Sequence, residues 1–346
     1  MMEILNCRIN EPLKMKKLLK KIFVSLVVYP FLYIHDSWPI WFYVLNRQGK
    51  KAYRQNPPAN GLLEKRIVAD LQSEGIALTN LEELFPKQNV LVELQAYVEK
   101  LLPTANPRKD KPFLLQINEY SEVIDFHNPF VRLALKPVVL AIVNGYMNMY
   151  AKFHYYSVAA AIPVDEGTVP LKSQRWHRDF DDKKTCKMFI YLSDVDEGSG
   201  PFMYIRETQY GARNHKKFPP VPSQGAYPPM EEVARVFSKD EIQICTGKAG
   251  TVIFADTRGL HRGGFASKNR RIMFTAEYAS EGAFLPVRYQ LSANFEKEIG
   301  KLNPPAFFAI KKEDFLTRTM QRASLLAMRL YQEYKLKDTS NGYRKT

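Results

Sequence analysis

A histidine and an aspartate two residues apart are the clearest chemical signal in the sequence. They lie in the segment Gln174-Arg-Trp-His177-Arg-Asp179. Residues two apart on a strand project from the same face, so an imidazole nitrogen and a carboxylate oxygen can meet at one ion. A second histidine, His261, follows the run Thr251-Val-Ile-Phe-Ala-Asp256, which is typical of a strand. We therefore predict one metal site with His177, Asp179 and His261 as ligands.

This set of ligands indicates the metal and its chemistry. Two imidazoles and one carboxylate on one face leave neighbouring positions open for a co-substrate and oxygen, the arrangement expected of non-haem iron(II). Zinc accepts the same three ligands, so a zinc-dependent hydrolase is the alternative enzyme. A jelly-roll binding protein without turnover is the alternative outside catalysis.

Two adjacent arginines follow the second histidine. Arg270 and Arg271 open the run Asn269-Arg-Arg-Ile-Met-Phe-Thr-Ala-Glu-Tyr278, shortly after His261. A buried guanidinium offers a planar fork to the distal carboxylate of a dicarboxylic keto acid, which a lysine cannot reproduce. The 2-oxo and 1-carboxylate oxygens of that acid would then chelate the metal.

Short β-rich runs separated by glycine, proline and aspartate dominate the chain from about residue 151. The expected strands are residues 153–160, 187–192, 201–205, 251–255 and 272–278. Many short strands with turn signals between them indicate a mainly β fold with flanking helices. We predict a double-stranded β-helix core, the jelly roll of cupin-like proteins.

Helices are expected before and after this β-rich part. Apolar spacing predicts a helix from about residue 63 that ends at Gly75, a second over 90–101, and a third over 130–146 that Pro137 kinks or divides. The spacing of Leu316, Met320 and Ala327 predicts a C-terminal helix whose apolar face packs on the core. Residues 103–107 and 219–229, which are rich in proline, are expected to be loops.

Three segments together resemble the phytanoyl-CoA dioxygenase-like family of iron(II)- and 2-oxoglutarate-dependent oxygenases. The segments are Trp176-His177-Arg-Asp179, Ser193-Asp-Val-Asp-Glu-Gly-Ser-Gly-Pro-Phe-Met-Tyr204, and Gly250-Thr-Val-Ile-Phe-Ala-Asp-Thr-Arg-Gly-Leu-His261 with Arg271 after it. The resemblance covers about residues 62–285. It implies iron(II), 2-oxoglutarate and oxygen as reactants and the hydroxylation of a C–H bond, with release of succinate and carbon dioxide.

The resemblance also implies roles for single residues. His177, Asp179 and His261 match the metal ligands, Arg271 matches the arginine that anchors 2-oxoglutarate, and Tyr191 falls where the family often has an aromatic residue beside the co-substrate. Because Asp179 is present, the site resembles that of a hydroxylase rather than that of a halogenase.

Two features depart from the family. Residues 206–211 replace a proline-glycine-serine-histidine turn, so the loop on the substrate side should be reshaped. The interval from His261 to Arg271 is one residue shorter than the commonest spacing, which leaves Arg270 as the alternative anchor.

Composition limits the setting of this chemistry. The chain has 346 residues and a net charge of +14, which favours an anionic partner or surface. Its three cysteines have no metal-clip or redox spacing, and a reducing, cytoplasmic compartment fits them best. We expect a small-molecule or lipid-like substrate and no nucleic acid. A turn-rich stretch predicts a boundary between an N-terminal appendage, residues 1–60, and an oxygenase domain, residues 61–346.

The appendage is basic and aromatic. Its lysines cluster before an apolar run, and they are Lys14, Lys16, Lys17, Lys20 and Lys21. The run over residues 22–34 is interrupted by Pro30 and is shorter than the roughly 20 residues of a spanning helix, so we predict no transmembrane span. We expect residues 14–45 to contact an anionic membrane peripherally instead.

Overall fold

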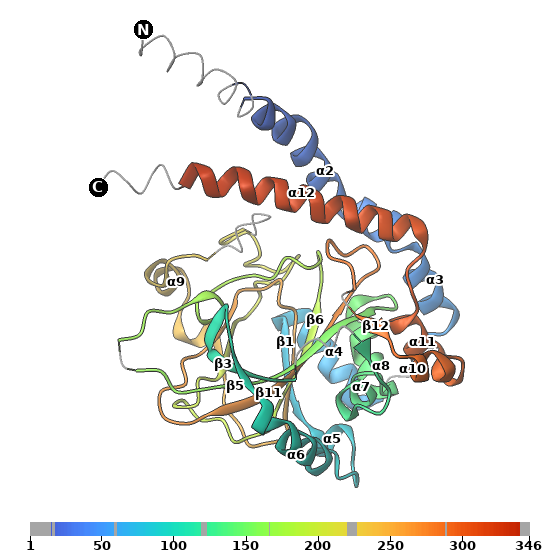
Figure 1. Cartoon of the computed structure of the whole chain (residues 1–346), viewed down its shortest axis with the longest axis vertical. Helices are drawn as coiled ribbons and strands as arrows, with labels where there is room; N and C mark the ends of the chain where they lie inside the picture. The colour runs from blue at the N-terminus through green and yellow to red at the C-terminus, as the bar shows by residue number, and fades with distance from the viewer. Residues whose placement is uncertain are drawn as a thin grey trace.

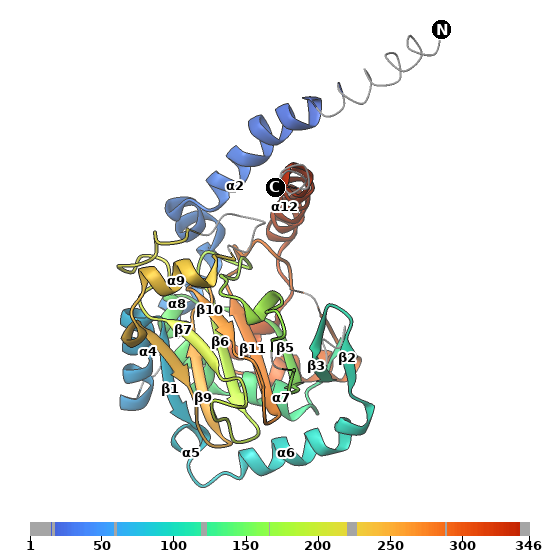
Figure 2. The same cartoon turned by 90° about the vertical axis from the view of Figure 1, so that its left-hand side faces the viewer.

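A seven-stranded sheet with the strand order β1-β9-β6-β11-β5-β3-β2 lies at the centre of the computed structural model (Figures 1 and 2). The structure describes residues 15, 18–58, 61–118, 123–165, 167–219, 227–287 and 289–339. Its strands are β1 (Ile76–Asn80), β2 (Asn106–Arg108), β3 (Lys111–Asn118), β4 (Val123–Ile124), β5 (Lys152–Ala161), β6 (Cys186–Tyr191), β7 (Phe202–Ile205), β8 (Ile242–Cys245), β9 (Thr251–Ala255), β10 (His261–Gly263), β11 (Arg271–Ala279) and β12 (Gln290–Leu291). A smaller sheet, β10-β7-β8, faces the large one.

The chain alternates between the two sheets, as a double-stranded β-helix requires. β5, β6, β9 and β11 lie together in the large sheet, while β7, β8 and β10 form the small one. His177 pairs with His261, the first residue of β10, in an isolated antiparallel bridge at the edge of the small sheet. The neighbouring strands of both sheets are antiparallel. The predicted fold class, a mainly β jelly roll with flanking helices, is confirmed.

Successive side chains along a strand point alternately toward the helices and toward the space between the two sheets. On β6, Met188 and Ile190 pack against the helices, whereas Phe189 and Tyr191 pack between the two sheets. Both sets are buried, so the strand is buried along its whole length although it contains Lys187, and it still has two distinct faces.

The described helices lie around and beyond the two sheets. They are η1 (Val24–Val28), α2 (Tyr29–His35), η2 (Ile40–Leu45), α3 (Arg47–Gln55), α4 (Leu62–Glu74), α5 (Leu81–Leu84), α6 (Val90–Leu101), η3 (Leu102–Thr104), α7 (Pro129–Ala134), α8 (Pro137–Met147), η4 (Lys172–Gln174), α9 (Met230–Val236), η5 (Lys239–Glu241), α10 (Ala293–Glu298), η6 (Ile299–Lys301), α11 (Pro304–Ile310) and α12 (Phe315–Thr339). Buried side chains of α4, α6, α7 and α8 join those of the sheet in the main core.

The helices before the β-rich part match the sequence prediction. α4 ends at Gly75, whose φ of 80° is in the left-handed region that favours glycine. α6 covers the predicted residues, and Pro137 begins α8 after a break that separates it from α7.

One segment differs from the expected loop. Residues 103–107 contain part of η3 and the start of β2, and the hairpin that β2 forms with β3 was not predicted. Pro107 is tolerated because β2 is the edge strand of its sheet. The other expected loop, residues 219–229, lies largely outside the described residues.

The apolar run near the N-terminus forms a longer helix than predicted. Leu18–His35 is one helix of 18 residues, long and apolar enough to cross a membrane by length and composition, a test that signal sequences also pass. The prediction that this run is too short to span was therefore wrong. A π-helical turn, η1, precedes Pro30 and keeps the helix continuous at a residue that lacks a backbone N–H donor.

The C-terminal helix packs on this N-terminal helix. Val24, Val28 and Leu32 form a buried cluster with Ala327 and Met328 of α12. The expected core-facing stripe of α12 is only partly correct, because it included a leucine, Leu316, that is 57% exposed. α12 buries a narrow line of side chains against one helix rather than a broad face against the sheet.

The segment between these helices and the domain is tied to the loop that follows Asp179. The indole Nε1 of Trp41, a fully buried residue, donates a hydrogen bond of 2.6 Å to Oδ1 of Asp182. Asp36 lies 3.3 Å from the ammonium of Lys183. Residues of the predicted appendage therefore contact the loop that presents a candidate metal ligand.

Candidate metal centre

Backbone pairing brings the two distant histidines side by side. The backbone N–H of His177 donates to the carbonyl of His261 at 2.9 Å, and the reverse bond is 3.0 Å long. The backbone N–H of Asp179 donates to the carbonyl of Thr257 at 2.8 Å, which fixes the loop after the first histidine. One ligand atom from each of His177, Asp179 and His261 lies within 4.8 Å of the others.

The imidazole rings present their outer nitrogens to this point. Nδ1 of His177 lies 2.9 Å from the carbonyl of Arg175, and Nδ1 of His261 lies 3.0 Å from that of Gly259. A carbonyl only accepts, so each Nδ1 carries the proton and each Nε2 keeps its lone pair for a metal. The Nε2 atoms lie 3.8 and 3.5 Å from the Asp179 carboxylate oxygens.

Burial and charge set suitable protonation states. Burial lowers the pKa of His177, and it lowers the pKa of His261 to about 3, with a further contribution from His177. Burial alone would raise the pKa of Asp179, but Lys187 and the two imidazoles hold that pKa well below its usual range. At neutral pH the site therefore consists of two neutral imidazoles and one carboxylate.

A buried lysine holds the carboxylate ligand. Nζ of Lys187, on β6, lies 2.7 Å from Oδ2 of Asp179 and 2.9 Å from Oε2 of Glu277, on β11. Lys187 and Glu277 are direct cross-strand partners, and Glu277 is completely buried. Burial would lower the pKa of Lys187, but the two carboxylates raise it well above its ordinary value. This pair was not predicted from the sequence, although a lysine and a glutamate in otherwise apolar strands are an unusual signal.

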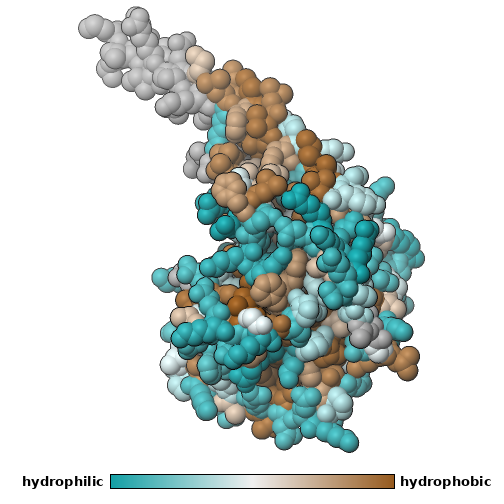
Figure 3. Space-filling view, turned by 90° about the vertical axis from the view of Figure 1, so that its right-hand side faces the viewer, coloured by the Kyte–Doolittle hydropathy of each residue, from teal (hydrophilic) through white to brown (hydrophobic). Residues whose placement is uncertain are grey.

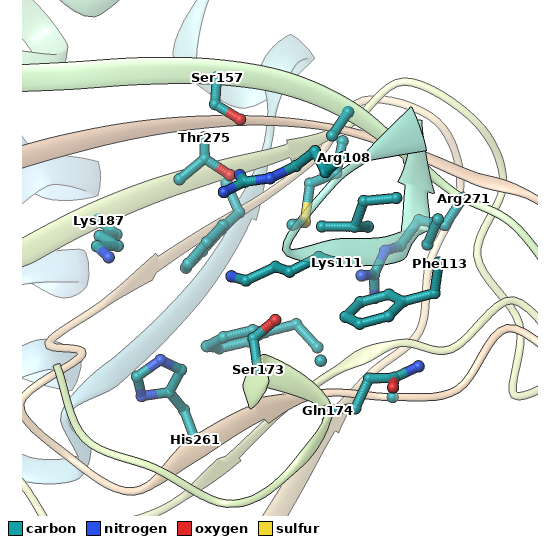
Figure 4. Close-up of a pocket in the computed structure, with 18 of the residues that line it drawn as sticks. Arg108, Lys111, Phe113, Ser157, Ser173, Gln174, Lys187, His261, Arg271 and Thr275 are labelled. Atoms are coloured by element: carbon teal, nitrogen blue, oxygen red, sulfur yellow. The ribbon is translucent and has the colours of Figure 1, made fainter. Parts of the chain in front are cut away.

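A cavity of about 300 Å³ opens beside the three ligands (Figure 4). Arg271 lines it and is 5% exposed, whereas Arg270 is exposed and lies outside the lining. The Arg271 guanidinium donates to the carbonyl of Gly200, and its Nε has no hydrogen-bond partner among the described residues. The structure thus places Arg271, and not Arg270, where an anionic ligand of the cavity would meet it.

Tyr191 occupies a different position from the other predicted residues. Its hydroxyl donates to the carbonyl of Cys245 at 2.7 Å and accepts from the N–H of Phe202 at 3.1 Å. The residue is fully buried between the sheets and does not line the cavity. A contact between Tyr191 and a co-substrate stays a prediction.

Two further cations line the cavity, and the sequence analysis did not identify them. Arg108 and Lys111 come from the hairpin of β2 and β3. Their proximity to the metal ligands depends on where this hairpin joins the edge of the sheet, next to β5. The spacing of the two residues gave no indication of it.

Neither a family model nor a curated protein matches the chain. The resemblance to the phytanoyl-CoA dioxygenase-like family is therefore not confirmed and stays a prediction.

Several solved structures are similar to the chain at low identity. The epimerase SnoN, in complex with Fe3+, alpha ketoglutarate and nogalamycin RO, is 16% identical with a TM-score of 0.48, over 64% of this chain and 85% of that one. EctD from S. alaskensis, with bound Fe, is 18% identical with a TM-score of 0.46, over 65% and 79%. HygX from Streptomyces hygroscopicus, with nickel, 2-oxoglutarate and hygromycin B bound, is 16% identical with a TM-score of 0.42, over 62% and 87%. Because these identities and TM-scores are low, the fold is assigned from the strand order and pairing of this chain.

The buried pair of Lys187 and Glu277 leads to a prediction about stability. Lys187→Met should lower the free energy of unfolding by about 3–5 kcal/mol, because it leaves the Glu277 carboxylate buried without its counter-charge. The double variant Lys187→Met/Glu277→Gln should recover part of this loss. Denaturant unfolding without added metal measures both. A double variant no more stable than the additive sum of the single variants would contradict the pairing.

Proposed function

We propose that the chain is an iron(II)- and 2-oxoglutarate-dependent dioxygenase that hydroxylates a C–H bond of a small or lipid-like substrate. The observation that carries the proposal is the convergence of His177, Asp179 and His261 within 4.8 Å at a cavity that also contains the buried Arg271. When bound, iron(II), 2-oxoglutarate and oxygen supply the oxidation and yield succinate and carbon dioxide.

The residues of the chain have distinct roles in this proposal. His177, Asp179 and His261 would hold the metal, since imidazole and carboxylate ligands suit iron(II). Lys187 orients the Asp179 carboxylate through the contact of 2.7 Å. Arg271, whose side chain lines the cavity, would bind the distal carboxylate of 2-oxoglutarate through its guanidinium.

The arginine also favours this function over its rivals. A zinc-dependent hydrolase can use the same three ligands, but its reaction gives no role to a buried guanidinium in the same cavity. A binding protein without turnover would not need three converging ligand atoms. The motifs that resemble the phytanoyl-CoA dioxygenase-like family support the same choice, and we propose that the chain is related to that family.

Loss of either histidine tests the proposed metal centre. His177→Ala and His261→Ala should each abolish succinate formation and weaken iron(II) binding by more than the roughly 10–100-fold typical of an outer-shell partner. Asp179→Ala should keep some metal on the two histidines and lose hydroxylation. His215→Ala, a histidine outside the cavity, is the control. Unchanged turnover of 2-oxoglutarate in either ligand variant would refute the assignment.

The adjacent arginines provide a matched pair for the co-substrate. Arg271→Ala should raise the dissociation constant of 2-oxoglutarate roughly 30-fold or more, because about 2 kcal/mol is lost when one partner of a buried charge pair is removed. Iron(II) binding should stay unchanged. Arg270→Ala removes the same charge at an exposed position and should have little effect. Anaerobic titration of the iron-loaded protein measures both, and the reverse result would move the role to Arg270.

We also propose that the N-terminal helix attaches the enzyme to an anionic membrane. Figure 3 shows apolar side chains gathered along the part of the molecule that projects from the domain. Exposed apolar residues on this helix include Leu19, Phe23 and Leu26, of which the last is 71% exposed. Its other face packs on α12, so the helix is apolar around most of its surface, as membrane helices are. Two buried free cysteines, Cys186 and Cys245, agree with a reducing, cytoplasmic location of the domain.

Vesicle flotation tests this attachment. The full-length protein should bind anionic vesicles, and Lys20→Gln/Lys21→Gln should weaken binding roughly 30-fold at low ionic strength, from about 1 kcal/mol per lysine. Phe23→Glu/Leu26→Glu should abolish it, because two charges would enter the apolar layer. Leu62→Glu changes an even more exposed leucine, on α4, and is the control. Equal binding by the wild type and the glutamate variants would disprove the attachment.

A further inference from the structure

The hairpin of β2 and β3 places two positive side chains directly opposite each other. Arg108 and Lys111 are cross-strand partners on either side of the turn at Lys109 and Asp110. Both side chains line the cavity, and Figure 4 shows the two extending into it side by side. Like charges in directly opposed positions of a hairpin destabilise it, so their shared direction needs an explanation.

The hairpin neutralises only one of these charges. Asp110 holds the Arg108 guanidinium with contacts of 3.1 and 3.3 Å. Within the described ranges, the Lys111 ammonium has no hydrogen bond and no ion pair within 4.0 Å. Burial lowers the pKa of Lys111 to about 8, and Arg108 lowers it further while the Asp179 and Asp110 carboxylates oppose the shift, so the side chain is still mostly protonated at neutral pH. An unpaired cation in a largely buried position is costly unless an anion binds beside it.

The other positive groups of the cavity belong to the metal centre or to the proposed co-substrate site. Lys187 lies between the carboxylates of Asp179 and Glu277. Arg271 lies on another part of the wall, near Phe113 and Gln174 in Figure 4. Among the described residues the Lys111 ammonium is therefore left without a counter-ion, and the Arg108 guanidinium beside it shares its acidic partner, Asp110, with Lys172.

We propose that Arg108 and Lys111 together bind an anionic group of the substrate, a carboxylate or a phosphate, next to the metal centre. This inference rests on the proposed function and adds to it the chemical class of the substrate. A guanidinium binds either group with two hydrogen bonds, and an ammonium adds a point charge. Phe113, Leu114 and Ile162 line the same cavity and provide apolar surface for the carbon skeleton. The substrate is thus an organic anion with an apolar body.

Three probes with one carbon skeleton test this assignment: hexanoate, hexyl phosphate and hexanamide. Each is titrated by calorimetry, without oxygen, into protein whose loading with iron(II) and 2-oxoglutarate has first been measured. At least one of the two anions should bind roughly 10-fold or more tightly than the uncharged amide, since bonds between charged partners are about twice as strong as neutral ones. The anion that binds more tightly distinguishes a carboxylate site from a phosphate site.

Variants of the hairpin then locate the effect. Arg108→Gln/Lys111→Met should remove the preference for the anions and leave the affinity for 2-oxoglutarate unchanged. Lys109→Met removes an exposed charge from the same turn and should keep the preference. Equal binding of all three probes, binding of none, or a preference that survives in the double variant overturns the proposal. So does a double variant that weakens 2-oxoglutarate instead, because the two cations would then belong to the co-substrate. Failure to load iron(II) at the outset would refute the proposed function itself.

Discussion

Burial of the Asp179 carboxylate is the constraint on which the candidate site depends. A carboxylate out of water is unfavourable unless charge and hydrogen bonds compensate it, and Lys187 provides that charge at 2.7 Å. The lysine is itself buried, so it needs the second carboxylate of Glu277 on the adjacent strand. The ion cluster therefore ties the loop after His177 to two central strands of the large sheet. A metal at the three ligands would add positive charge to the same balance.

The N-terminal segment also contacts the loop that follows Asp179. Trp41 donates to Asp182, and Asp36 pairs with Lys183, so two consecutive residues of the loop after Asp179 are held by a segment that precedes the domain. Burial raises the pKa of Asp182 to about 6, against the hydrogen bonds that lower it. The helix that we propose to lie in a membrane is thus connected through a few side chains to the loop of the metal centre.

Local properties of the sequence determined most of the framework. Apolar periodicity, a glycine stop at Gly75 and the break at Pro137 predicted α4, α7 and α8, because these signals act within a few residues of the chain. Short β-rich runs with turn signals between them predicted the core strands and the jelly roll. The three candidate ligands could be named as well, since His177 and Asp179 share a strand-like spacing and His261 follows a recognisable strand.

Only the tertiary structure decided which charges meet. Arg270 and Arg271 are neighbours in sequence, and the register of β11 alone turns the second into the cavity. The pairing of Lys187 with Glu277 joins strands far apart in the chain, and the hairpin of Arg108 reaches the site through the edge of the sheet. The sequence by itself determined the candidate ligands and most of the elements, because those patterns are local. The partners of each buried charge depend on burial and strand pairing, which arise only when distant segments fold together.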